Sequence, residues 1–225
     1  MTPDQNARVP MVTIDGPSGA GKGTVASLVA SARGWHLLDS GALYRIVAVV
    51  SEARNIDLAD VEALVMLSAG LDIVFSDGQV VVDGVDLTDK IRTEEAGSRA
   101  SQVAALPEVR GAILKLQHGF RKAPGLVADG RDMGTVVFPD APVKIFLDAS
   151  AEARAERRYN QLKNNGLGVN LRALLEQIQE RDARDRERAV APLKPAQDAL
   201  IIDSTDMSID AVVAKVMTQL ANKIG

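Results

Sequence analysis

The sequence predicts an α/β fold of three layers, with helices on both faces of a parallel central sheet. Short apolar segments alternate along the chain with amphipathic helical segments, and this alternation is typical of such a sheet. The chain has 225 residues, of which 46% are hydrophobic, and this is enough for one sizeable core. We therefore expect a single domain built on one sheet.

Local signals bound each expected element. The expected strands of the main sheet share a short run of mainly apolar residues: 11–15, 35–38, 126–129, 143–148 and 200–203. The expected helices are 22–33 and 41–54, which have apolar residues at helical spacing, two helical stretches at 93–105 and 108–121, and two charged helices at 151–162 and 171–188. Gly34 suits the end of the first helix, Pro107 suits an early helical position, and Ser208 suits the N-cap of a final helix.

The middle of the chain has a different pattern, in which short strands are joined by tight turns. Residues 71–75 and 79–82 flank an Asp-Gly pair at 77–78, which is typical of a hairpin turn. A second Asp-Gly pair at 83–84 precedes a third apolar run at 85–87. These signals predict a small antiparallel sheet inserted into the main fold.

Composition excludes several classes of protein. The net charge is −4, so the chain lacks the positive field that nucleic acids or anionic membranes require. Without cysteine there is no disulfide, thiolate zinc site or cysteine nucleophile. No apolar run approaches the ~18 residues of a membrane helix, and residues 1–10 are polar, unlike a signal peptide. We expect a cytoplasmic monomer with a short disordered lead-in and no nucleic-acid or membrane partner.

A glycine-rich segment between the first expected strand and helix fits the Walker A template Gly-x-x-x-x-Gly-Lys. Its residues are Gly16, Pro17, Ser18, Gly19, Ala20, Gly21, Lys22, Gly23 and Thr24. Glycine lets backbone N–H groups converge on phosphate oxygens, and the helix adds its positive N-terminal end. Lys22 can reach the β- and γ-phosphates, and the Thr24 hydroxyl is the expected Mg²⁺ ligand. The segment predicts a P-loop NTPase-type fold that binds ATP and Mg²⁺.

Three residues near this loop bear on its interpretation. Gly23 lies where many P-loop proteins carry Ser or Thr, and the Gly-Lys-Gly-Thr ending is typical of nucleoside monophosphate kinases. Asp15 is either associated indirectly with the metal or a polar residue that merely ends a strand. Asp129 closes an apolar strand as a Walker-B aspartate would, or it caps a helix.

A kinase also needs an acceptor pocket and cations that neutralise the transferring phosphoryl group. Two segments follow strands at the sheet edge where open α/β folds bind ligands: 39–41 with Arg45, and 129–134. The third candidate is a charged helix on which Arg181, Asp185 and Arg188 share one face. The alternative for that helix is a solvated surface with ion pairs four residues apart.

Five segments of the chain resemble bacterial cytidylate kinases: 14–24, 37–45, 128–139, 181–188 and 191–193. The resemblance runs in order from about Val12 to Asp210. It implies transfer of the γ-phosphoryl group of ATP to CMP or dCMP, with Mg²⁺. It also implies three regions of one domain, and their approximate bounds are a core at 11–40, 122–150 and 190–225, an acceptor-binding region at 41–121 with the β insertion at 71–87, and a mobile lid at 151–189 with a flexible break at 164–168.

The same resemblance implies roles for individual residues. Ser101, Arg110 and Asp132 would contact the cytosine, with Asp132 accepting from the 4-amino group that uracil lacks. The residues implied to hold the CMP phosphate and ribose are Ser40, Arg45, Arg131, Arg181 and Asp185. The lid arginines implied to close over ATP are Arg157, Arg158 and Arg188. The residues implied to act in catalysis are Lys22, Arg131 and Arg188.

Other interpretations stay open at this point. Ser101 and Arg110 lie in no local motif and could be surface residues, and 157–158 could be an ordinary helical charge pair. His36 and His118 are too scattered for a triad or a metal site, so we expect both to be structural. A GTP-dependent switch is disfavoured because no Asn-Lys-x-Asp motif occurs. A kinase of the same fold that acts on another acceptor, such as UMP or shikimate, is the closer alternative.

Overall fold

The computed structural model describes residues 9–76, 79–164, 166 and 168–224. The chain forms two compact units, one comprising the segments up to Leu38 and from Gly119 onward, the other Asp39–His118. Three predictions concern residues outside the described ones: the disordered lead-in for residues 1–8, the hairpin turn at 77–78, and part of the break at 164–168.

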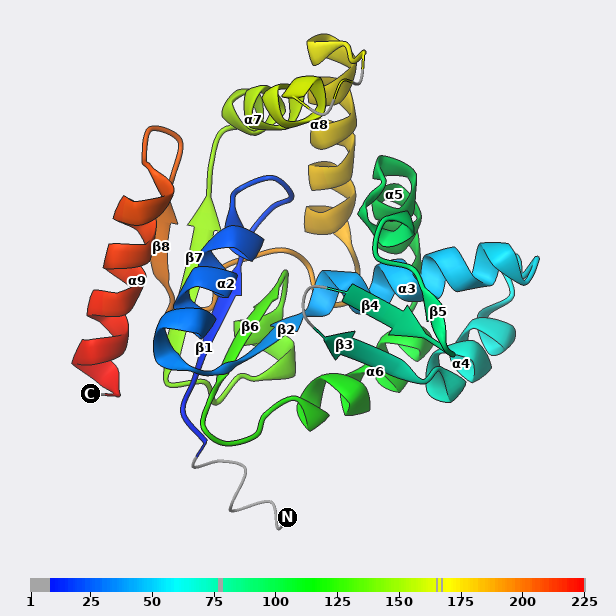
Figure 1. The fold of residues 1–225 in the computed structure, drawn as a ribbon, viewed down its shortest axis with the longest axis horizontal. Helices are drawn as coiled ribbons and strands as arrows, with labels where there is room; N and C mark the ends of the chain where they lie inside the picture. The colour runs from blue at the N-terminus through cyan, green and yellow to red at the C-terminus, as the bar shows by residue number, and fades with distance from the viewer. Residues whose placement is uncertain (1–8, 77–78, 165, 167, 225) are drawn as a thin grey trace. The chain divides into compact units, whose positions relative to one another are not determined.

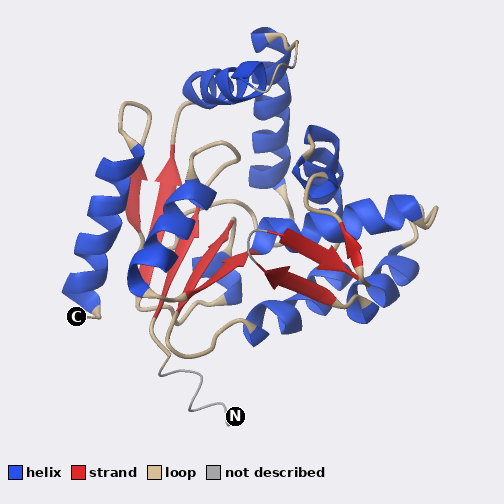
Figure 2. Cartoon of the chain, in the orientation of Figure 1, coloured by secondary structure: helices blue, strands red, loops and turns tan. Residues whose placement is uncertain are grey.

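The first unit contains a five-stranded sheet with the order β2-β6-β1-β7-β8 (Figures 1 and 2). Its strands are β1 (Met11–Asp15), β2 (His36–Asp39), β6 (Leu126–Gly130), β7 (Val143–Asp148) and β8 (Leu200–Asp203). The central strand β1 pairs in parallel with β6 and β7, and β7 pairs in parallel with β8. The predicted parallel sheet is therefore confirmed. Every residue of β1 is buried, as a central strand covered on both faces requires.

Helices α2 (Lys22–Arg33) and α9 (Ile209–Lys223) pack against one face of this sheet and against each other (Figure 1). Ser208 caps α9 as predicted, its hydroxyl accepting from the Ala211 N–H. The opposite face is covered in part by a π-helical turn, Met133–Val137 (η2). A Cβ on Gly134 in that turn would lie 2.8 Å from the Thr13 hydroxyl, so only glycine lets the turn approach β1 so closely. No sequence signal predicted this turn.

Two further helices of the first unit, α7 (Ala151–Asn164) and α8 (Leu171–Glu187), pack against each other. Asn170 caps α8 by accepting from the N–H groups of Arg172 and Ala173. The predicted helices 151–162 and 171–188 correspond to α7 and α8 within two residues at each end. No helix among the described residues is both long and apolar enough to cross a bilayer.

The second unit combines helices with a small antiparallel sheet, as predicted. Its helices are α3 (Ser40–Ala53), α4 (Val61–Gly70), α5 (Glu94–Val103) and α6 (Pro107–Gly119), with a 3-10 turn at Lys90–Arg92. Its strands are β3 (Ile73–Ser76), β4 (Gln79–Val82) and β5 (Val85–Asp86), in that order. The prediction missed α4, which Asp60 caps. Its apolar residues lie at too many consecutive positions to form a clear helical stripe.

Candidate active site

The predicted phosphate loop connects the end of β1 to the start of α2. Gly16, Gly19 and Gly21 have φ angles of 149°, 80° and 91°, in the range that favours glycine. A Cβ on Gly16 would lie 1.9 Å from the Leu147 carbonyl oxygen, so a side chain would displace the loop from β7. The strand–loop–helix arrangement expected for a P-loop is thus present in the chain.

Lys22 is buried, and its ammonium group contacts the backbone of this loop. Its Nζ donates to the Pro17 carbonyl at 2.8 Å and lies 4.0 Å from a carboxylate oxygen of Asp129. Burial, then the charges of Arg131 and Arg181, lower the pKa of Lys22 to about 7, although Asp129 opposes the shift. Three cationic side chains therefore gather where the glycine-rich loop presents its backbone, and this favours a polyanionic ligand.

Asp129 is the penultimate residue of β6 and does not cap a helix, because the turn that follows begins at Met133 with Asp132 at its N-cap position. Gly23, in the first turn of α2, lies near the Asp129 carboxylate. A Cβ on Gly23 would lie 3.5 Å from an Asp129 carboxylate oxygen, which is ordinary contact. The start of α2 therefore lies beside this carboxylate, and the hydroxyl is carried by Thr24.

Asp15 has a structural task in this site. Its two carboxylate oxygens accept from the backbone N–H groups of Met133 and Gly134, each at 2.8 Å. These bonds fix the π-helical turn to the end of β1, which supports the interpretation of Asp15 as a polar residue ending its strand. Burial raises the pKa of Asp15 to about 7, although both backbone N–H groups act in the opposite direction.

We expect Asp15→Ala to destabilise the protein by about 1–3 kcal/mol for each N–H left without an acceptor. Asp15→Asn, which keeps one acceptor oxygen, should lose about half as much. The raised pKa adds a pH signature. The unfolded state ionises first as the pH rises from about 4 to about 7, so the stability advantage of wild type over Asp15→Asn should fall across that window. Urea unfolding at several pH values measures both effects, and a flat difference would contradict the assigned shift.

A cluster of arginines connects α8 to the strand ends of the sheet. Arg131 donates from Nε to a carboxylate oxygen of Asp185 at 3.0 Å, and Arg188 donates to the Asp185 carbonyl at 3.3 Å. Arg181 donates to the Ser18 hydroxyl at 3.2 Å. The structure thus brings Arg181 into contact with the P-loop, and Asp185 and Arg188 into one cluster with Arg131. Burial is the largest single influence and lowers the pKa of Arg131, but the charge and hydrogen bond of Asp185, together with the charges of Asp129 and Asp182, outweigh it and raise the pKa above its ordinary value.

Two further predicted acceptor residues, Ser40 and Arg45, lie in the second unit. Ser40 begins α3, and its hydroxyl accepts from the side-chain amide of Gln117 on α6 at 2.9 Å. The Arg45 guanidinium donates to the backbone carbonyls of Ile91 and Thr93, at 2.7 and 3.0 Å.

Ser101 and Arg110, the two residues of this unit that are predicted to contact the cytosine base, are both buried. Ser101 lies on α5. Arg110 lies on α6. Its guanidinium carbon is 5.8 Å from the centre of the Tyr44 ring, and a guanidinium nitrogen donates to the Ala104 carbonyl at 3.3 Å. Asp132, the third predicted base reader, is buried in the first unit. Burial of a serine and an arginine argues against the interpretation of these positions as surface residues.

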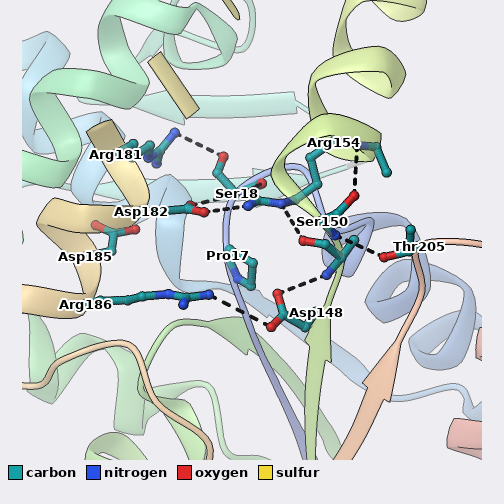
Figure 3. Close-up of polar contacts among 12 residues, drawn as sticks. Pro17, Ser18, Asp148, Ser150, Arg154, Arg181, Asp182, Asp185, Arg186 and Thr205 are labelled. Carbon is teal, nitrogen blue, oxygen red and sulfur yellow. Dashed lines mark hydrogen bonds and ion pairs between the residues drawn. The ribbon is translucent and has the colours of Figure 1, made fainter. Parts of the chain in front are cut away.

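The predicted lid arginines differ in their surroundings. Arg157 donates to the carbonyls of Ser204 and Thr205, which tie α7 to the loop after β8. Arg158 donates to Gln161 within α7 at 2.8 Å. Arg154, also on α7, contacts the P-loop directly, although no sequence signal singled it out (Figure 3).

His36 has a structural contact, as its sequence suggested. Its Nε2 forms a hydrogen bond with the Ala123 carbonyl at 2.9 Å. Within the residues that the structure describes, no group of three or more His, Asp or Glu side chains is arranged to hold a metal ion.

Comparison with known proteins adds independent information. Residues 12–222 match the model of a family described as cytidylate kinase. A protein named cytidylate kinase from Pseudomonas paraeruginosa is 62% identical over 218 residues, covering 94% of this chain and 95% of that protein. One of the same name from Salmonella choleraesuis is 57% identical over 222 residues, covering 97% and 98%. Among solved structures, an uncharacterized protein from Eubacterium ventriosum shares the fold, with a TM-score of 0.50 and 10% identity over 94% of this chain and 98% of that one.

Proposed function

The chain belongs to the cytidylate kinase family and is an ATP-dependent nucleoside monophosphate kinase, and we propose that it transfers the ATP γ-phosphoryl group to CMP or dCMP. The observation that carries the site assignment is the convergence of Lys22, Arg131 and Arg181 beside the glycine-rich loop. Transfer of a phosphoryl group requires positioning and charge neutralisation more than covalent chemistry. The attacking CMP phosphate is already anionic, so no general base is needed.

On the donor side, the backbone N–H groups of 16–24 hold the ATP phosphates, and Lys22 neutralises the β- and γ-phosphates. Lys22 then exchanges its bond to the Pro17 carbonyl for phosphate oxygens. The negative charge of the nucleotide raises the pKa of Lys22 back toward its ordinary value, so the lysine is fully charged when the loop is loaded. Arg157, Arg158 and Arg188 exclude water from the transferring group.

Mg²⁺ fits the residues at the start of α2. The Thr24 hydroxyl is the protein ligand we assign, and the Asp129 carboxylate, 4.0 Å from the Lys22 ammonium group, is a second protein oxygen near the phosphate loop. Mg²⁺ is commonly held by one or two protein oxygens together with substrate phosphates and water. When bound, Mg²⁺ would supply charge neutralisation to the ATP phosphates.

On the acceptor side, Ser40, Arg45 and Arg131 hold the CMP phosphate, and Arg181 with Asp185 hold the ribose. Ser101, Arg110 and Asp132 read the base, with Asp132 accepting from the cytosine 4-amino group. Uracil presents a carbonyl oxygen there and would leave the Asp132 carboxylate facing another acceptor. A buried polar group that loses its partner gives strong discrimination between such substrates.

Steady-state assays with ATP and CMP, dCMP, UMP or AMP test this proposal. We expect kcat/KM for CMP to exceed that for UMP by at least about 10²-fold. Equal rates with UMP and CMP would overturn the base-reading assignment. Hydrolysis of GTP without an acceptor, at rates comparable to transfer, would instead favour a switch-type NTPase.

Gln117 provides a test of the Ser40 assignment. Because its amide donates to the Ser40 hydroxyl oxygen, the Ser40 proton is left to donate to an acceptor phosphate. We expect Gln117→Met to raise the KM for CMP about 3- to 10-fold, the loss of roughly one neutral hydrogen bond, with the KM for ATP unchanged. The same substitution in a Ser40→Ala background should add nothing. Equal losses in both backgrounds would show that Gln117 does not act through Ser40, and Gln102→Met on the exposed side of α5 is the matched control.

A further inference from the structure

Arg154 is almost fully buried, with an exposed fraction of 2%, although it carries a permanent charge. It lies in the first turn of α7, just after the end of β7 (Figure 3). Its guanidinium group donates to three different parts of the first unit: the Ala149 carbonyl at 2.9 Å, the Ser18 carbonyl at 3.0 Å, and both carboxylate oxygens of Asp182. Because these hydrogen bonds use donors on all three nitrogens of the planar guanidinium group, they fix the orientation of the Arg154 side chain.

The bond to Ser18 fixes a peptide plane inside the phosphate loop. A trans peptide directs its C=O and N–H groups to opposite sides. Because the Ser18 carbonyl points to Arg154, the N–H of the same peptide, which belongs to Gly19, points away from α7. Gly19 has a φ of 80°, and a Cβ there would lie 3.3 Å from the Arg154 Cβ, so glycine allows both the turn and the close approach of α7.

We propose that Arg154 is a positioning residue of the kinase reaction, which orients the Ser18–Gly19 peptide so that the Gly19 N–H is held ready to donate to the ATP phosphates. This inference rests on the proposed function only in taking the loop to be the ATP-binding site. Arg154 does not act on phosphate itself, because its charge is matched by the two oxygens of Asp182 and its side chain is buried.

Asp182 connects Arg154 to helix α8. It lies on α8 next to Arg181, and Arg181 donates to the Ser18 hydroxyl. Both α7 and α8 are therefore bonded to the single loop residue Ser18, one through its carbonyl and the other through its side chain (Figure 3). The orientation of the loop peptide and the placement of α8 are coupled through the Arg154–Asp182 pair.

The test separates the loop bond from the ion pair. Arg154→Met/Asp182→Leu replaces the pair with apolar side chains, so no buried charge is left alone and the fold is expected to persist. We expect its dissociation constant for ATP, measured by calorimetry on the full chain without acceptor, to rise about 10- to 100-fold, as for one lost charge-assisted bond. The dissociation constant for CMP should rise less than that for ATP, since Arg154 bonds the phosphate loop itself but acts on the acceptor residues of α8 indirectly, through the placement of that helix.

A second variant and a spectroscopic readout guard against misfolding. Arg154→Lys keeps the charge but cannot serve Ser18 and Asp182 together, and it should weaken ATP binding about tenfold. In ¹⁵N-labelled protein, the large shift of the Gly19 amide on ATP binding should shrink in both variants. The matched control replaces an exposed pair on α8, Arg172→Met/Glu176→Leu, and should bind ATP as wild type does.

Two results would overturn the proposal. One is an ATP affinity within twofold of wild type in either folded variant, and the other is an unchanged Gly19 amide shift. Equal weakening of ATP and CMP binding would likewise mean a general structural role. Failure of the proposed function is distinguishable, because wild type would then bind ATP normally while failing to phosphorylate CMP.

Discussion

Replacing Lys22 with methionine is expected to lower kcat/KM for ATP by about 10²- to 10³-fold, the usual loss when one preorganised charge is removed from a developing anion. Methionine has nearly the length of lysine and fills the same buried space. The loss should fall mainly on kcat, because the γ-phosphoryl group carries its greatest need for charge neutralisation in the transition state.

The same substitution should leave the unliganded protein at least as stable as wild type. Burial and the nearby arginines lower the pKa of Lys22, which means that the folded state disfavours its charge. Removing the ammonium group removes that cost, while the Pro17 carbonyl loses one donor. Urea unfolding and steady-state kinetics on the same preparation measure both quantities. Lys215→Met on the exposed face of α9 is the control, and a Lys22→Met enzyme within threefold of wild type would refute the assignment.

The strand–loop–helix arrangement of the phosphate loop could be predicted because its signals are local. The glycines, the lysine and the flanking strand and helix lie within 14 consecutive residues from Met11 to Thr24, and each has a direct physical meaning. The strands β1, β4, β7 and β8 have the predicted bounds, since short apolar runs with turn residues at both ends leave little freedom.

The residues that position the site could not be predicted in this way. Arg154 meets Ser18 across 136 positions of the chain, and Gln117 meets Ser40 across 77. The tertiary packing of the chain decides which residues meet over such distances. A single arginine or glutamine in a charged or amphipathic helix has no sequence signal that identifies its partner. The π-helical turn that Asp15 fastens was missed for the same reason, because its stabilising acceptor lies on a distant strand.

Arg131→Ala should lower turnover by about 10³-fold, a loss of the order known for cationic groups that stabilise a transferring phosphoryl group. Arg131 interacts with residues assigned to both nucleotides. Its charge acts on Lys22, which is assigned to ATP, and its Nε donates to Asp185 on α8, which is assigned to the CMP ribose. The remaining guanidinium donors can engage a phosphate in the fork geometry that lysine cannot reproduce. Arg131→Lys should therefore recover only a small part of the lost activity.

The test must separate this role from the loss of a buried ion pair. Arg121 is a suitable comparison, since it is also buried and bonded to an aspartate, Asp140 at 2.6 Å, but lies in no proposed binding site. We expect Arg121→Ala to lower the free energy of unfolding while each folded molecule turns over normally. Arg131→Ala should lose turnover even where unfolding curves show the protein to be folded. Near wild-type rates in Arg131→Ala, or equal losses in both variants, would show that Arg131 serves the fold rather than the phosphoryl transfer.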